Sequence, residues 1–568
     1  MKPTVAAGLN NLSSYQAAWL RRDVVAGLVL TALLVPQGMA YAELAGLPPI
    51  TGLYTTILCL VAYAVFGPSK ILVLGPDSSL GPMIAATIIP LLVVGDDPGR
   101  AVALGSALAL LVGVIITAAG LAKLGFIADL ISKPTIIGYM NGLALTILVG
   151  QLPKLFGFSV DGDGFRAELT GFLQGVADGE TVAAALAIGL FGLALILGLG
   201  RWLPRVPGVL VAVVLSIGAA IVFDLADHGV DLVGELPQGF PPFTIPRVSL
   251  ADLGLLFAGA FGIALVSLAD TISTASAFAA RSDDEVNGQQ EMIGIGAANL
   301  AAGLFQGFPV STSGSRTAVA ERAGAKSQVT GLVGAAAILL ILLFLPGLLR
   351  DLPQPTLAAV VIAASLSLAD IPETLRLRRI RRTEFLLSMA AFLGVVLLGV
   401  LPGIALAVAL SIGNVFRRAW WPYQTTLGRV PGLAGYHDVT SYPEANLMPG
   451  CVIFRFDAPL FFANSRTFRE QIRAIAAREP RPRWIVVASE PITDVDTTAA
   501  DMLEELDEEL NARGISLVFA EMKDPVRHKV ERYELTDTID PRHFFPTITQ
   551  AMKEYQRQTG AEWQPPTS

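Results

Sequence analysis

The 568-residue sequence has little of what disulfide-bonded, haem-containing or nucleotide-driven proteins need. Its two cysteines are too few for a disulfide framework or a metal cluster. Its four histidines lie outside the long apolar stretches, which speaks against a haem or histidine-metal enzyme in a membrane. The phosphate-binding pattern G-x-x-x-x-G-K-S/T does not occur, so nothing supports pumping driven by ATP. We therefore expect no enzymatic activity, no cofactor and no nucleic-acid partner.

Charge is scarce as well, since 15% of the residues are charged and 53% are hydrophobic. This composition excludes an ordinary soluble enzyme and indicates a polytopic membrane protein. About 20 apolar residues of helix cross the hydrocarbon core of a bilayer. On that measure the sequence predicts fourteen spans, two of them from the stretch 385–416, which Leu401-Pro402-Gly403 is expected to break. The other spans are 24–42, 44–69, 75–94, 101–122, 134–151, 181–200, 206–223, 253–280, 292–307, 308–321, 327–349 and 352–369.

The loops agree with this count when their charges are sorted by side. With the N-terminus in the cytoplasm, Arg21 and Arg22, the run "RLRRIRR" at 376–382, and Arg417 and Arg418 all lie inside. The loop "DLADHGVDLVGE" at 224–235 is then outside and acidic. We expect a multi-pass protein of the cell (inner) membrane with both termini cytoplasmic and no cleavable signal peptide.

The composition changes after the last predicted span, so the chain divides into regions. Residues 1–22 are predicted to form a cytoplasmic N-terminus and residues 23–420 the transmembrane domain. The segment 421–444 is rich in proline and glycine and is predicted to be a linker. In 445–560, short apolar runs alternate with amphipathic helical patterns, which predicts a cytoplasmic α/β domain.

Two predicted spans are short and broken at their start. They open with "GPDSSLGP" (75–82) and "FPVSTSGSR" (308–316), and each is the third span of its half if fourteen spans divide into seven and seven. An odd number of spans inverts the second half, which is typical of transporters built as inverted repeats. A helix that begins inside the bilayer presents free N–H groups and a positive dipole end. The two breaks therefore predict an anion site.

Arg316 stands on the first turn of the second broken helix, where it could add a permanent positive charge to an anion pocket. The alternatives are that it only pairs with Asp270, the lone acid of its predicted span, or reaches an interface.

Four features in this order resemble the sulfate permease (SulP) family of anion transporters. They are "LVPQGMAYAELAGLPPITGLYTTI" (34–57), "LGPDSSLGP" (74–82), "SGSRTAVAERAGAKSQVTG" (313–331) and the terminal α/β domain. The resemblance implies a fold like that of the uracil permease, with a core domain of spans 1–4 and 8–11 and a gate domain of spans 5–7 and 12–14. It also implies that the tail is a STAS domain and that the protein is a homodimer, with a possible protein partner at the STAS domain.

The resemblance also implies the site. Asp77 either caps the first broken helix or takes part in ion coupling. Asp270 is the stronger coupling candidate, and with Thr274 one turn on it resembles a sodium site of bicarbonate-carrying relatives. Gln37 and Tyr41 share a helix face, and an interhelical hydrogen bond is the alternative for both. The expected substrate ligands are Gln37, Tyr41, Ser78, Ser79, Ser313, Ser315 and Arg316.

The mechanism expected from the sequence is secondary-active uptake of a small anion by alternating access, with proton symport as first choice. Sodium symport, anion exchange and an anion channel are the alternatives. The expected substrate is a small carboxylate or dicarboxylate such as fumarate, followed by bicarbonate and sulfate. In the tail, Asp496 or Thr497 is expected to cap a helix. Resemblance to anti-sigma-factor antagonists implies that Thr497 or Thr498 lies near their phosphorylated serine.

Overall fold

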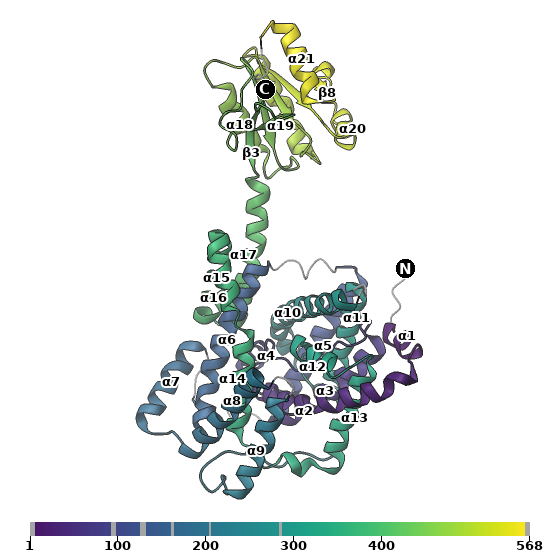
Figure 1. Ribbon diagram of the computed structural model, residues 1–568, viewed down its shortest axis with the longest axis vertical. Helices are drawn as coiled ribbons and strands as arrows, with labels where there is room; N and C mark the ends of the chain where they lie inside the picture. The colour runs from purple at the N-terminus through teal and green to yellow at the C-terminus, as the bar shows by residue number, and fades with distance from the viewer. Residues whose placement is uncertain are drawn as a thin grey trace. The chain divides into compact units, whose positions relative to one another are not determined.

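The computed structural model describes residues 6–92, 98–124, 132–160, 164–203, 206–282 and 287–562 (Figure 1). The first five residues of the predicted N-terminal segment 1–22 lie outside this description. The chain forms two compact units, Met1–Ser411 and Ile412–Ser568. We call them the membrane unit and the C-terminal unit.

The membrane unit is helical apart from two very short strands. Its α-helices are α1 (Ala7–Ser13), α2 (Leu20–Leu44), α3 (Pro49–Phe66), α4 (Gly81–Ile88), α5 (Pro98–Leu121), α6 (Lys133–Phe156), α7 (Phe165–Asp178), α8 (Ala183–Trp202), α9 (Gly208–Val222), α10 (Leu250–Ser282), α11 (Gly288–Leu304), α12 (Gly314–Arg322), α13 (Val329–Phe344), α14 (Gln354–Leu368), α15 (Ile371–Ile380), α16 (Arg382–Leu398) and α17 (Val400–Trp420), which continues into the C-terminal unit. Its strands are β1 (Leu74–Gly75) and β2 (Ser311–Thr312), and its short 3-10 helices are η1 (Ala17–Trp19), η2 (Ile89–Leu91) and η4 (Pro346–Leu349).

Each predicted span overlaps one α-helix, from α2 to α6, from α8 to α14, and α16 and α17. Within the described residues, eight helices are long and apolar enough to cross a membrane. Helices α4, α9 and α13 are shorter and apolar. The multi-span membrane fold is therefore confirmed, while the count of fourteen stays a prediction.

Local sequence explains where several helices start. Proline suits a first helical turn because its missing N–H has no partner there anyway. Pro49 opens α3 for this reason, five residues after the predicted span began, and Pro82 is the second residue of α4. The side chains of Asn287 and Asp370 cap α11 and α15 by accepting backbone N–H bonds at 3.2 and 3.0 Å.

The break in the stretch 385–416 lies at Gly399, and the prediction that Leu401-Pro402-Gly403 makes it was wrong. Helix α16 ends at Leu398, Gly399 has a φ of +98°, and α17 starts at Val400. A glycine adopts positive φ without steric cost, whereas Pro402 fits the first turn of the new helix. Three α-helices in the membrane unit were also not predicted, α1, α7 and α15; the last carries part of the arginine run expected in a loop.

Strands β1 and β2 pair antiparallel, with Leu74 opposite Thr312 and Gly75 opposite Ser311. The contact extends beyond the strands at Val73, because Ser313 N donates to Val73 O at 3.1 Å and Val73 N donates to Thr317 Oγ1 at 3.1 Å. Each strand leads directly into a short helix, β1 into α4 and β2 into α12. The two broken segments, far apart in the sequence, therefore begin side by side.

The packing of helices relates the two halves of the membrane unit. Helix α2 packs on α13 and α10 packs on α5, while α3 packs on α11. Asp23 at the start of α2 accepts bonds from Ser327 N and Oγ and from Thr330 Oγ1 at the start of α13. Asp252 at the start of α10 contacts Arg100 at the start of α5 at 3.4 Å. The same kind of contact in each half supports the inverted-repeat pairing.

The C-terminal unit contains a six-stranded sheet in the order β4-β3-β5-β6-β7-β8. Strands β5 to β8 are parallel, and β3 is antiparallel to both neighbours. The strands are β3 (Gln424–Gly428), β4 (His437–Asp438), β5 (Cys451–Phe456), β6 (Trp484–Ala488), β7 (Ser516–Ala520) and β8 (Phe544–Phe545). The helices are α18 (Ser465–Ala476), α19 (Thr497–Asn511), α20 (Asp524–Arg532) and α21 (Ile548–Thr559), with η5 at Pro541–His543.

Two hydrophobic clusters hold this sheet, one on each face. Helices α18, α19 and α20 bury residues such as Phe468, Leu506 and Val526 on one face, and α21 buries Met552 and Tyr555 on the other. Residues 421–444, expected to be a linker, instead contribute β3 and β4 to the sheet. Alternation of apolar side chains is weak in such short strands, so the sequence did not reveal them.

Candidate functional site

A cavity of about 400 Å³ lies in the membrane unit where β1 and β2 lead into α4 and α12. Helices α2, α10 and α14 supply most of its other walls. Every membrane residue predicted for the site lines this cavity except Arg316. The lining set includes Gln37, Tyr41, Asp77, Ser78, Ser79, Asp270, Thr274, Ser313 and Ser315.

Asp77 closes the turn that leads into α4. Its Oδ1 accepts bonds from Ser79 N at 2.9 Å and Ser79 Oγ at 2.7 Å, and its carbonyl oxygen accepts from Gly81 N at 3.1 Å. On the opposite side, Ser313 caps α12 by accepting from Arg316 N at 3.5 Å. The Asp77 side chain thus caps the turn that precedes α4, whereas α4 itself begins after Leu80 without a side-chain cap, so both roles of Asp77 stay predictions.

Ser79 joins two carboxylates. Its Oγ lies 2.7 Å from Asp77 Oδ1 and 3.1 Å from Asp270 Oδ2. Asp270 comes from the middle of α10, 191 residues further along the chain. The hydroxyl thus connects the first broken helix to α10 inside the cavity wall.

Arg316 lies behind the cavity rather than in its lining. It is 1% exposed, and its Nη2 donates to Pro76 O at 2.6 Å and to Asp77 Oδ2 at 3.4 Å. It passes close to Gly75, where an added Cβ would lie 2.5 Å from Nη1, so a larger residue there would displace the guanidinium group. Of the partners considered from the sequence, Asp270 is not the one; the arginine pairs with Asp77.

Some contacts in the cavity wall involve residues that were not predicted from the sequence. Thr312 Oγ1 donates to Thr271 Oγ1 at 3.0 Å, which ties β2 to α10. Thr274 lies beside Gly314, whose added Cβ would be 3.9 Å from its Oγ1. Small and apolar side chains complete the cavity wall. Nothing in an apolar sequence distinguishes them from other residues of the spans. They are Leu33, Met140, Ile196, Val209, Val319, Val360, Ala363, Ala364, Ser367 and Leu368.

The charge of the cavity is unusual for an anion site. Among the described residues that line it, Asp77 and Asp270 are the charged ones, and the side-chain groups able to donate hydrogen bonds are hydroxyls and one amide. Arg316 brings one positive charge against Asp77 from behind. An anion therefore meets an excess carboxylate unless that carboxylate is neutralised.

The two threonines predicted for regulation lie in the C-terminal unit, not in the cavity. Thr497 and Thr498 are exposed on the first turn of α19. Asp496 is the cap, because it accepts bonds from Ala499 N at 2.8 Å and Phe462 N at 2.8 Å. Phosphorylation of either threonine stays a prediction.

Two half-helices that start side by side in an apolar bundle, around a cavity lined with hydroxyls, are the arrangement typical of transporters with discontinuous helices. The chain belongs to the sulfate permease family: the family model matches residues 20–391, and a STAS domain model matches residues 442–551.

Relatives and solved structures agree with this assignment. A Mycobacterium tuberculosis (strain H37Rv) protein named "Probable sulfate transporter" is 41% identical over 97% of this chain and 98% of its own length. The inward-facing structure of murine Slc26a9, an anion transporter, superposes with a TM-score of 0.88 at 24% identity, covering 97% and 94% of the two chains. The transmembrane domain of the cyanobacterial bicarbonate transporter BicA gives 0.60 at 22% identity, covering 69% and 98%. These two structures show the fold alone.

Proposed function

We propose that the protein is a proton-coupled symporter that takes up a small inorganic oxyanion by alternating access. Sulfate is the first candidate, because a relative with 41% identity over nearly the whole chain carries that name. Bicarbonate is the second, on the fold shared with a bicarbonate transporter. The dicarboxylate expected from the sequence gains no support from these names.

The contact that carries the proposal is the chain Asp77, Ser79 and Asp270. A serine hydroxyl has one hydrogen, so Ser79 can donate to only one of the two carboxylates that it contacts. If Ser79 donates to Asp77, the contact with Asp270 becomes a hydrogen bond only when Asp270 is protonated and donates to Ser79 Oγ. A proton on Asp270 therefore completes the chain.

The same proton lowers the charge that an anion meets. With Arg316 offsetting Asp77, protonation of Asp270 removes the remaining negative charge of the cavity. In a site away from water, two like charges a few ångströms apart repel strongly. Binding of the proton and of the anion then favour each other, which is the basis of symport.

The packing of helices supports a moving core and a fixed gate. Helices α2, α3, α5, α10, α11 and α13 pack mainly on one another, and α6, α8, α9, α14 and α16 do the same. These sets correspond to the core and gate domains inferred from the family resemblance. The cavity takes residues from both sets, so a displacement of one set against the other would change its access.

The test is uptake of labelled sulfate, bicarbonate and fumarate into proteoliposomes, with and without an inward proton gradient and without sodium. Wild-type uptake of one anion should rise with the gradient, and Asp270→Asn should abolish that rise. Asp252→Asn is the matched control, since it removes a carboxylate from the same helix outside the cavity. Equal gradient dependence in wild type and Asp270→Asn would exclude coupling through this carboxylate.

Sodium symport is the second candidate, because Thr274 lines the cavity together with Asp270. In that case uptake requires sodium and Thr274→Val reduces the affinity for it. A requirement for a trapped counter-anion would instead indicate exchange, and uptake without saturation would indicate a channel. The predicted homodimer is checked by the mass of the purified protein in detergent.

A further inference from the structure

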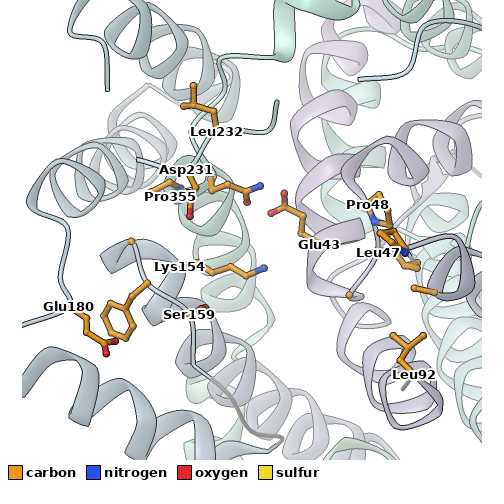
Figure 2. A pocket seen from close by; sticks show the side chains of 16 residues that line it. Glu43, Leu47, Pro48, Leu92, Lys154, Ser159, Glu180, Asp231, Leu232 and Pro355 are labelled. Atoms are coloured by element: carbon orange, nitrogen blue, oxygen red, sulfur yellow. The ribbon is translucent and has the colours of Figure 1, made fainter. Parts of the chain in front are cut away.

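A second cavity, of about 1160 Å³, lies further along the helices that line the first (Figure 2). Helix α2 contributes Gln37 and Tyr41 to the first cavity and Glu43 to the second. Helix α6 contributes Met140 and then Lys154, about 21 Å further along its axis. The first residues of α14, Gln354 and Pro355, line the second cavity, and residues of α14 from Val360 onward line the first. The two cavities thus lie in succession between the same three helices.

Packed side chains close the space between the cavities. Leu143 and Ile147 of α6 and Leu357 of α14 lie between the lining positions of the two cavities and are at most 2% exposed. The second cavity also takes Asp231 from the loop 224–235, which the charge pattern predicts to be outside. In the predicted orientation, the second cavity therefore lies on the outer side of the membrane unit, and the buried side chains named above separate it from the first cavity.

The outer cavity is acidic apart from one side chain. Among the described residues that line it, Glu43, Glu180 and Asp231 are negative and Lys154 is positive. Such a rim repels an anion, so Lys154 is the one place on it where an anion gains a charge contact. Figure 2 shows Lys154 of α6 and Glu43 of α2 extending into the cavity from opposite sides.

Glu43 is the group with which an anion would compete. Its Oε1 is buried and has no hydrogen-bond partner among the described residues. A buried carboxylate oxygen without a partner is costly. Gln354 is a hydrogen-bonding neighbour of the Glu43 carboxylate, and the ammonium group of Lys154 supplies the positive charge near it. The two residues belong to helices from the two packing sets described above, so movement between the sets changes their separation.

We propose that Lys154 and Glu43 form an outer anion-recognition site, in which the entering anion replaces Glu43 as the partner of Lys154. The site selects small anions at the outer mouth and passes them toward the inner cavity. This inference rests on the proposed function and on the predicted orientation of the chain.

Uptake of external sulfate and bicarbonate by intact cells that produce the full-length protein tests the site. Lys154→Gln should raise the KM for the external anion about fivefold with little change in maximal rate, as expected for one unit charge a few ångströms from an anion in water. Lys154→Arg should restore the wild-type KM. Lys133→Gln is the matched control, because Lys133 begins the same helix and pairs with Glu373; its KM should equal that of wild type.

A double-mutant cycle tests the pairing. Glu43→Gln should lower the KM about twofold by freeing Lys154. In the Lys154→Gln background the same change should have a smaller effect, because no ammonium group remains to be freed. Equal effects in both backgrounds would show that the two residues act independently and would overturn the competition.

Cysteine substitution tests the side of the membrane. The two native cysteines are buried, so Lys154→Cys adds an accessible thiol. An external impermeant reagent that attaches a positive group should lower the KM of this variant, and one that attaches a negative group should raise it. Reaction only from the inside would overturn the outer location.

The outcomes separate the two proposals. If wild type takes up none of the tested anions, the proposed function fails. If wild type transports one of them and Lys154→Gln keeps its KM, or loses only maximal rate, the outer site fails and the proposed function stands.

Discussion

Around the cavity of the membrane unit, charged side chains are few and buried, whereas on helices α18 and α19 of the C-terminal unit they are many and exposed. Arg316 and Asp77 are 1% and 13% exposed at the side chain and contact at 3.4 Å. Arg473 and Glu509 are 45% and 23% exposed and contact at 2.5 Å, and Glu509 has a second partner in Arg513. Water screens the second pair and not the first.

The comparison teaches that contact distance alone does not rank these pairs. The shorter pair lies in water, where each ion is solvated without its partner. The longer pair lies away from bulk water, where an ion that loses its partner keeps only its few hydrogen bonds to neighbouring groups. The buried charges around the cavity are therefore individually required, whereas single charges on α18 and α19 can be lost with little effect.

The largest effect is expected from removal of the buried cation. Arg316→Ala leaves Asp77 without a counter-ion, so we expect a loss of about 3–5 kcal/mol in stability and no measurable transport. Thermal unfolding in detergent and proteoliposome uptake measure this. Arg322→Ala, an exposed arginine on the same helix, is the control. Adding Asp77→Ala to Arg316→Ala should recover part of the stability. Equal unfolding temperatures for Arg316→Ala and Arg322→Ala would refute the comparison.

The next largest effect is expected on the stability of the C-terminal unit, where one carboxyl group is buried although most charged side chains are exposed. Asp507 is 1% exposed, its Oδ1 has no partner among the described residues, and burial raises its pKa to about 6. Its pKa in the unfolded chain is about 3.9. Because folding raises this pKa, protonated Asp507 favours the folded state. Its contribution to the free energy of unfolding is complete below about pH 4 and is lost as the pH rises to about 6.

Asp507→Asn should therefore raise the free energy of unfolding by about 2 kcal/mol at pH 7 and leave it nearly unchanged at pH 4. The new amide oxygen still accepts the bond from Asn511. Denaturant unfolding of the C-terminal unit, which has hydrophobic clusters of its own, measures the difference. Asp501→Asn on the exposed face of α19 is the control. A gain that is the same at both pH values would count against burial as its cause.

A smaller effect is expected from the hydroxyl between the two carboxylates. Ser79→Ala removes its bonds to Asp77 and Asp270, and we expect uptake to fall about tenfold, the equivalent of one charge-assisted hydrogen bond. Ser367→Ala is matched, because Ser367 lines the same cavity and bonds only to the carbonyl of Ala364 among the contacts described. If both variants transport equally, the chain through Ser79 has no part in transport.

The smallest effect is expected where charges are redundant. In a double-mutant cycle of Arg473→Ala and Glu509→Ala, the coupling should stay below about 1 kcal/mol and shrink in salt. Denaturant unfolding of the C-terminal unit measures it. A coupling above about 2 kcal/mol would show that exposed pairs here are as individually required as the buried one.

The sequence by itself determined the helices and the kind of residue at each break. Runs of apolar residues long enough to cross a bilayer are helical because a backbone in hydrocarbon must satisfy its own hydrogen bonds. Hydroxyls and an aspartate at Asp77–Ser79 and Ser313–Ser315 suit the start of a helix wherever the helix lies. The polar residues at the two breaks could therefore be predicted from the sequence, whereas most of the apolar side chains that complete the cavity lining could not.

Only the tertiary structure decided which of these residues face each other. Helical periodicity assigns Gln37 and Tyr41 to one face of a helix but does not say what lies opposite. Strands of two residues carry no period at all, so the pairing of β1 with β2 was invisible. The outer cavity, which Glu43 and Lys154 line from helices distant in sequence, was hidden for the same reason.

Arg316 shows the limit most clearly. Its position beside a broken helix predicted a charge near an anion, but a long side chain can reach in several directions. In the folded protein, Gly75 leaves space for it and Pro76 O and Asp77 accept its bonds. Those partners lie about 240 residues earlier in the chain and come within reach only when the two halves pack together.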